Sequence, residues 1–192
     1  AVSKPVSDTV ATTAVDSGTH LFDFATLNIQ ALSSPLAAAQ TQAEKLVTEF
    51  LSQSDAREQL FALFDGGQST PSEAWMQATN ALLASAQNGE TSIRVELRSS
   101  AELQGARGAF VATGTTGEPT IYLNADWLAG SGTWSTLGAA DSASITRVLM
   151  EELGHGLDAQ LNAGGDTAGD EGEIFSRIVI DSANPLSVSY LS

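Results

Sequence analysis

Residues 146–158 read TRVLMEELGHGLD, and the interpretation of the whole chain starts from this stretch. Its leucines recur every four residues and predict one buried helix stripe: Leu149, Leu153 and Leu157. At about 100° per residue, Glu151, His155 and Asp158 fall within an arc of about 60° beside that stripe. The sequence therefore predicts a long helix over about 142–161 that presents polar side chains along one face.

A carboxylate and an imidazole at positions i and i+4 of a helix can bind one metal ion, because they lie one turn apart on the same side. Glu151 and His155 have this spacing, which zinc peptidases use for two of their ligands. Glu152 directly follows the first ligand position, where such enzymes keep the carboxylate that accepts a proton from water. Glu151 and His155 are thus candidate metal ligands, and Glu152 is the candidate catalytic residue.

Residues 151–157, EELGHGL, resemble the HExxH helix of the zincin metallopeptidases, with Glu151 in place of the first histidine. The resemblance implies a zincin-like fold and metal-dependent peptide-bond hydrolysis. It also implies a substrate-binding edge strand before this helix, which we place at 121–124, and a third ligand on an acidic helix after it. The implied cofactor is a divalent metal. Zn²⁺ is favoured, and Mn²⁺ or Ca²⁺ are alternatives because a carboxylate replaces an imidazole.

The acidic helix expected over about 169–181 supplies the candidate for the third ligand. Glu171 and Glu173 are two residues apart and point about 160° away from each other, so they cannot both face inward. Four apolar residues predict the buried arc of this helix: Ile174, Phe175, Ile178 and Val179. Glu171 falls near the centre of that arc and Glu173 lies opposite. We therefore expect Glu171 to be the third ligand, with Asp170 as the alternative if the helix begins later.

Three further helices are predicted in the first half of the chain. The first covers about 35–51, and the second opens at residue 54 or 55 and stops before two consecutive glycines. The third begins with Thr70-Pro71-Ser72-Glu73, a capping box that places Pro71 at the first helical position, and ends near residue 88.

Strands are predicted between these helices and the long one, over 92–98, 108–112 and 120–124, with the last two joined as a hairpin. Residues 21–24 form either a short strand or a packing anchor. Helices, then a small and mostly antiparallel sheet, then two helices make an α+β fold.

The domain is expected to cover residues 19–183, between a flexible arm over 1–18 and a linker over 184–192. The chain opens without an initiator methionine, and we expect it to be a processed piece of a longer protein. Residues 122–180 also resemble modules of large secreted, calcium-binding bacterial surface proteins. That resemblance implies a secreted or cell-surface location.

The amino-acid composition argues against several classes of binding partner. Acidic residues outnumber basic ones 23 to 8 and give a net charge of −15, which argues against nucleic acid and against anionic membranes. No cysteine is present, so disulfides and thiolate catalysis are excluded. No apolar run approaches the roughly 20 residues of a membrane span. The expected partners are a peptide or protein substrate, or flanking domains of the parent chain.

Other interpretations of the same residues stay open. His155 could be an ordinary helix histidine that bonds to Glu151 or Asp158, and the domain would then be a non-catalytic structural or adhesion module. A calcium loop over 166–173 is disfavoured because its sixth position is not glycine. A serine hydrolase is disfavoured because no Gly-x-Ser-x-Gly turn is present. Trp127 and Trp134 are expected to pack rather than to bind a ligand.

Overall fold

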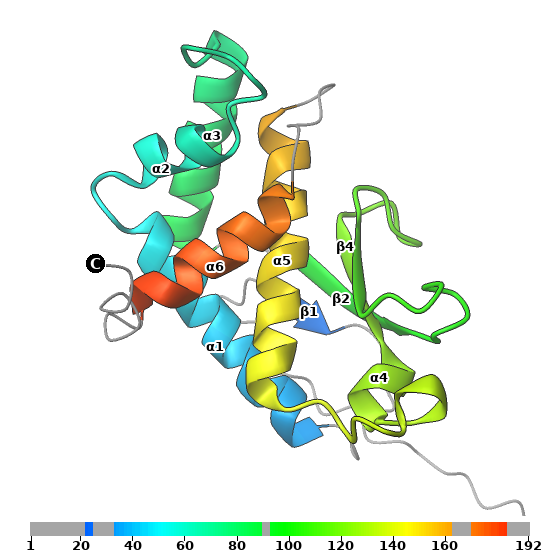
Figure 1. The fold of residues 1–192 in the computed structure, drawn as a ribbon. Helices are drawn as coiled ribbons and strands as arrows, with labels where there is room; N and C mark the ends of the chain where they lie inside the picture. Colours follow the sequence, from blue (N-terminus) through cyan, green and yellow to red (C-terminus); the bar gives the residue numbers. More distant parts are fainter. Residues whose placement is uncertain (1–21, 25–32, 90–92, 163–169, 184–192) are drawn as a thin grey trace, which may run out of the picture.

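The computed structural model describes residues 22–24, 33–89, 93–162 and 170–183. This part of the chain is a mixed α+β fold of six α-helices and one sheet (Figure 1). In chain order its elements are β1 (Phe22–Phe24), α1 (Ser33–Leu51), α2 (Ala56–Leu63), α3 (Glu73–Asn88), β2 (Ile93–Arg98), β3 (Gly108–Val111), β4 (Thr120–Asn124), α4 (Ala125–Ala129), α5 (Ser142–Leu161) and α6 (Glu171–Ala183). The five helices predicted from the sequence are present, and residues 22–24 form a strand.

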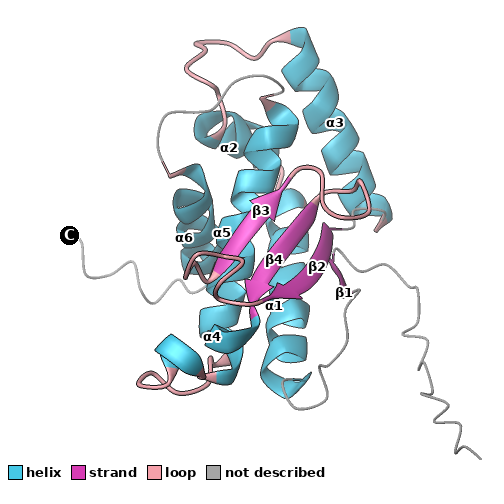
Figure 2. Ribbon diagram, turned by 90° about the vertical axis from the view of Figure 1, so that its right-hand side faces the viewer, coloured by secondary structure: helices cyan, strands magenta, loops and turns pink. Residues whose placement is uncertain are grey.

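The sheet has four strands in the order β1-β2-β4-β3 and lies in front of α1 and α5 in Figure 2. β1 pairs with β2 in parallel, β2 pairs with β4 in parallel, and only β3 and β4 are antiparallel. The expectation of a mostly antiparallel sheet is therefore wrong. Helices α1 to α3 separate β1 from β2, and such crossovers join parallel strands. The chain next forms β3 at the edge of the sheet and then turns back. β4 therefore lies between β2 and β3 and runs parallel to β2.

β3, and not the strand at 121–124, is the edge strand beside α5. β4 lies between β2 and β3, with Val95 opposite Ile121 on one side and Phe110 opposite Ile121 on the other. The expectation that 121–124 is the edge is wrong because Ile121 and Leu123 are fully buried, as in an interior strand. The hairpin prediction for β3 and β4 is confirmed.

α5 is the central helix of the molecule. It packs against α1 and α6 on one side and against β3 and β4 on the other (Figure 1). Its N-cap is Asp141, whose carboxylate accepts a hydrogen bond from the Ser144 backbone N–H at 2.7 Å. The predicted leucine stripe of this helix is buried, at 0–3% exposure: Leu149, Leu153 and Leu157.

Two helix details differ from the sequence analysis. α3 is capped by Ser72, whose hydroxyl accepts from the Trp75 backbone N–H, so Pro71 precedes the cap instead of opening the helix. On α6, Phe175 and Val179 are buried as predicted, but Ile174 and Ile178 are 39% and 38% exposed. The arc that α6 buries is therefore rotated away from these two isoleucines. It includes Glu171 and Ser176 instead.

One hydrophobic cluster contains residues of α1 to α6 and of β2 and β4. Phe175 of α6 reaches the centre of this cluster, with its ring edge-on to Phe50 of α1 at 5.4 Å between centroids. The expected arm over 1–18 and linker over 184–192 lie outside the described residues, as does residue 169 at the expected start of the acidic helix. None of the described helices combines the length and apolarity that a bilayer crossing requires.

Candidate metal centre

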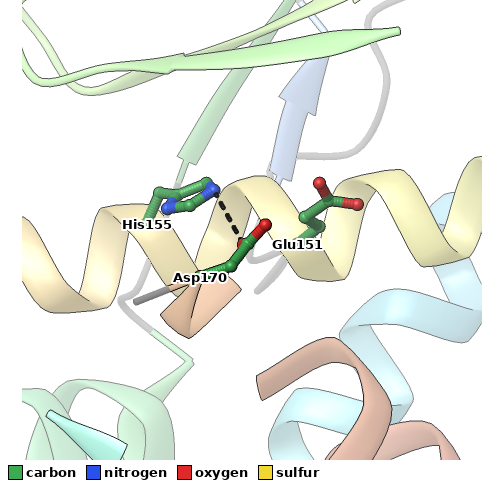
Figure 3. Close-up of side chains that lie close together, drawn as sticks. All are labelled: Glu151, His155 and Asp170. Carbon is green, nitrogen blue, oxygen red and sulfur yellow. Dashed lines mark ion pairs between the residues drawn. The ribbon is translucent and has the colours of Figure 1, made fainter. Parts of the chain in front are cut away.

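Three side chains from α5 and from the residue before α6 converge on one point. They are Glu151, His155 and Asp170, and each offers a ligand atom within 4.8 Å of the other two. Glu151 and His155 lie on one side of α5, and the carboxylate of Asp170 approaches them from below the helix (Figure 3). His155 Nε2 is 3.9 Å from Asp170 Oδ1, which is an ion pair when the imidazole is protonated.

The third member of the group is Asp170, the alternative candidate, rather than Glu171. Glu171 is buried at 4% exposure and Glu173 is exposed, as the sequence predicts. The group that the described residues form does not include Glu171. The helix begins at Glu171, which puts Asp170 at the position facing α5.

Asp170 also caps α6. Its Oδ1 accepts a hydrogen bond from the Glu173 backbone N–H at 3.0 Å, and its backbone carbonyl accepts from the Ile174 N–H. An aspartate three residues before a glutamate is a recognisable start signal for a helix, and it was the available clue that α6 begins at Glu171. A carboxylate oxygen carries two lone pairs, so Oδ1 can accept the cap bond and still face His155 as a ligand atom.

Two glycines allow α5 and α6 to cross closely at this point. A Cβ on Gly172 would lie 2.6 Å from His155 Nε2 and 2.5 Å from the Glu151 carbonyl oxygen. A Cβ on Gly154 would lie 2.7 Å from Gly172 Cα. Neither position can hold a larger residue without a shift, and the close crossing is what brings Asp170 next to His155.

Glu152 lies on the neighbouring face of α5, beneath the edge strand β3. A Cβ on Gly108 of β3 would lie 2.8 Å from Glu152 Oε1, and a Cβ on Gly156 would lie 2.9 Å from the Phe110 ring. Glycines on both elements therefore let the strand rest on the helix. Burial raises the pKa of Glu152 to about 7, and the charge of Glu151 adds to this. A hydrogen bond from the Phe110 backbone acts in the opposite direction.

Burial also raises the pKa of Glu151 above its ordinary value. The negative charge of Asp170 acts in the same direction, whereas His155 lowers the pKa. Buried carboxylates are costly to ionise, because water does not screen their charges. A bound cation neutralises these charges, so such a site favours cation binding.

The donor set and its spacing are suitable for a divalent metal. Two ligands that are each about 2.1 Å from a zinc ion are at most about 4.2 Å apart. The 3.9 Å separation of His155 Nε2 and Asp170 Oδ1 is within this limit, and the group as a whole lies within 4.8 Å, so a small inward movement of the side chains would complete the site. One imidazole and two carboxylates are a usual ligand set for Zn²⁺ or Mn²⁺, with positions left over for water and substrate.

A cleft of about 580 Å³ adjoins these carboxylates, between α5 and the residues that lead into β3. Glu151 and Glu152 lie at one end of its lining, and Arg107 and Arg147 contribute its basic side chains. This cleft could not be predicted from the sequence, because the two arginines are 40 residues apart and share no motif.

Comparisons with known proteins identify no relative: no family model, no curated protein and no solved structure matches this chain.

The close helix crossing leads to a prediction for Gly172→Ala. The added methyl group collides with the Glu151 carbonyl and with the His155 ring, so we expect a loss of about 1–3 kcal/mol in the free energy of unfolding. Metal affinity is expected to fall as well, because α6 must move away from α5. Thermal unfolding and metal titration measure the two effects. Glu173→Ala, at the neighbouring exposed position, is the matched control. Unchanged stability and affinity in Gly172→Ala would show that the crossing is looser than described.

Proposed function

We propose that this domain is a metal-dependent peptide hydrolase of zincin-like type, within a large secreted or cell-surface protein. Its ligands are Glu151, His155 and Asp170, and its general base is Glu152. The observation that carries the proposal is the convergence of three ligand atoms, two from α5 and one from the residue before α6, within 4.8 Å. The EELGH stretch that supplies two of the ligands supports it.

The edge strand supports a peptide as the substrate. β3 pairs with β4 on one side only, so its other edge can accept an added strand at the backbone groups other than the Phe110 N–H, which is bonded to Glu152. That strand lies over α5 at Glu152 and Gly156. A peptide paired with β3 would therefore pass the helix face that carries the candidate base and the candidate ligands.

Each residue then has a distinct chemical role. A divalent cation, when bound, polarises a carbonyl group and makes water easier to deprotonate. Glu152 takes the proton of the attacking water and delivers it to the leaving nitrogen. Because Glu152 is buried beneath β3, its carboxylate lies close to the backbone of a peptide that pairs with this strand. A base whose pKa is near 7 can both accept and release a proton at neutral pH.

The donor set favours Zn²⁺ first and Mn²⁺ second, because an imidazole nitrogen suits both and two carboxylates raise the affinity for the harder ion. Ca²⁺ is the weaker candidate, since it prefers six to eight oxygen ligands. The substrate is either a separate protein or a flanking segment of the parent chain.

Metal stoichiometry tests the proposal. The chain is dialysed against Zn²⁺ or Mn²⁺, and bound metal is measured by elemental analysis and calorimetry. We expect one ion per chain, and we expect His155→Ala to abolish binding. Asp170→Ser is expected to weaken binding strongly while keeping the α6 cap, because serine is an equally good N-cap.

Glu171→Ala separates the two candidates for the third ligand. It is expected to lower the melting temperature without changing metal stoichiometry. Asp170→Ser, in contrast, is expected to weaken metal binding without changing the melting temperature. Metal binding that survives both His155→Ala and Asp170→Ser would refute the centre. A chain that binds metal but leaves denatured proteins and its own flanks intact would instead be a non-catalytic module.

A further inference from the structure

Two arginines line the cleft beside the candidate metal centre. Arg107 comes from the segment that leads into β3, and Arg147 comes from the second turn of α5. The chain has only six arginines against 23 acidic residues. Two of the few positive charges in a strongly acidic protein therefore meet at one cleft.

Arg107 is held in place by aromatic rings. Its guanidinium lies 5.7 Å from the ring centroid of Trp127 and 5.6 Å from that of Trp134. Trp127 is buried, and the Trp134 indole N–H donates to the Ser100 hydroxyl at 3.0 Å. The rings are thus fixed, and their π faces orient the guanidinium without neutralising its charge. This contact also accounts for both tryptophans, which pack as predicted.

Arg147 projects from the same stripe of α5 as two candidate ligands. It is four residues before Glu151 and eight before His155, so all three share one helix face. Its side chain is exposed. Among the described residues, neither the Arg107 nor the Arg147 guanidinium forms an ion pair with a carboxylate. Arg94 and Arg98, in contrast, are both paired with Glu96.

The acidic groups of the cleft have other partners. Asp141 accepts the capping hydrogen bond of α5 at 2.7 Å. Glu151 belongs to the metal group, and Glu152 is buried beneath β3. The two guanidinium groups are therefore the positive charges that the cleft offers to an anionic group of an incoming molecule, and the charge of Arg107 also lowers the pKa of Glu151.

We propose that this cleft binds a carboxylate of the substrate, held between Arg107 and Arg147. This inference rests on the proposed function and specifies its substrate class: a peptide with a carboxylate close to the cleaved bond. Arg147 and Glu151 are one turn apart, which is a rise of about 6 Å. An extended peptide spans about 3.3 Å per residue, so the carboxylate lies about two residues from the bond to be cleaved. An acidic side chain or a free C-terminus can supply it.

Binding of matched peptides to the Glu152→Gln chain tests the proposal without cleavage. Four fluorescent peptides of one sequence are compared by anisotropy, with internal Glu or Gln and with a C-terminal acid or amide. We expect the Glu peptide or the C-terminal acid to bind about tenfold more tightly than its neutral partner, and the preferred pair identifies the source of the carboxylate. The preference is expected to shrink as salt increases.

Three arginine variants complete the experiment in the same background. Arg147→Gln should remove the preference, and Arg107→Gln should do so as well. Arg57→Gln, which removes an equally exposed arginine on distant α2, should retain it. Equal binding of charged and neutral peptides, or a preference that survives both cleft variants, would overturn the inference.

The same measurement in a His155→Ala background separates this inference from the proposed function. An arginine-dependent preference in this metal-free variant supports the subsite independently of the metal. The same preference in a wild-type chain that binds no metal and cleaves no peptide supports the subsite and refutes the hydrolase. Cleavage by the wild-type chain with no preference between Glu and Gln or between acid and amide supports the hydrolase and refutes the subsite.

Discussion

Glu152→Gln is expected to lower kcat of the zinc-loaded chain on a peptide substrate by roughly 10²- to 10⁴-fold, the usual contribution of a general acid-base residue. The amide has the same shape as the carboxylate, and its oxygen can still accept the Phe110 backbone hydrogen bond. It cannot accept the proton of an attacking water. The fold and the metal group, to which Glu152 does not belong, are expected to remain intact.

The measurement is hydrolysis of a quenched fluorescent peptide, followed with and without added Zn²⁺. Glu173→Gln is the matched control, because Glu173 is exposed on α6 and lies outside the metal group. If Glu152→Gln cleaves as fast as the wild-type chain, the proton is carried by another residue. If kcat is retained in Glu173→Gln and lost only in Glu152→Gln at unchanged metal content, the assignment stands.

The elements that local sequence controls were predicted correctly. The leucine repeat of α5 gave its extent, its buried stripe and the shared face of Glu151 and His155. The burial of Glu171 and the exposure of Glu173 also followed from helical geometry alone. These features depend on a period of 3.6 residues, which a sequence displays without reference to any distant segment.

Features that depend on distant segments were not predictable in this way. β2 pairs with β4 in parallel because β3 occupies the edge of the sheet. The residues of β2 and β4 do not indicate this strand order. Asp170 was ranked below Glu171 because burial was taken as the sign of a ligand. The structure instead places Asp170 beside Glu151 and His155, and this placement is set by the crossing of α5 over α6 at Gly154 and Gly172. The two glycines do not predict this crossing from the sequence, because the relative positions of α5 and α6 must be known first.

The pH dependence of stability is the second large expected effect, and it concerns the metal-free chain. The pKa of Glu152 is about 7 in the folded chain, against an ordinary value of 4.5 that we assign to the unfolded chain. Between these two values the unfolded chain releases the proton and the folded chain keeps it. The free energy of unfolding therefore falls as pH rises from about 4.5 to about 7. The expected loss is about 3 kcal/mol.

Glu152→Gln removes this titration, so its advantage over the wild-type chain should grow across the same pH window. Thermal unfolding in EDTA, followed by circular dichroism from pH 4 to pH 9, measures the difference. We expect similar melting temperatures near pH 4 and a mutant that melts about 5–10 °C higher at pH 8.

The general repulsion from a net charge of −15 affects both chains in nearly the same way and cancels in the comparison. A difference that stays flat with pH would show that Glu152 is ionised beneath β3. A higher melting temperature combined with lost turnover would identify Glu152 as a residue whose burial costs stability and serves catalysis.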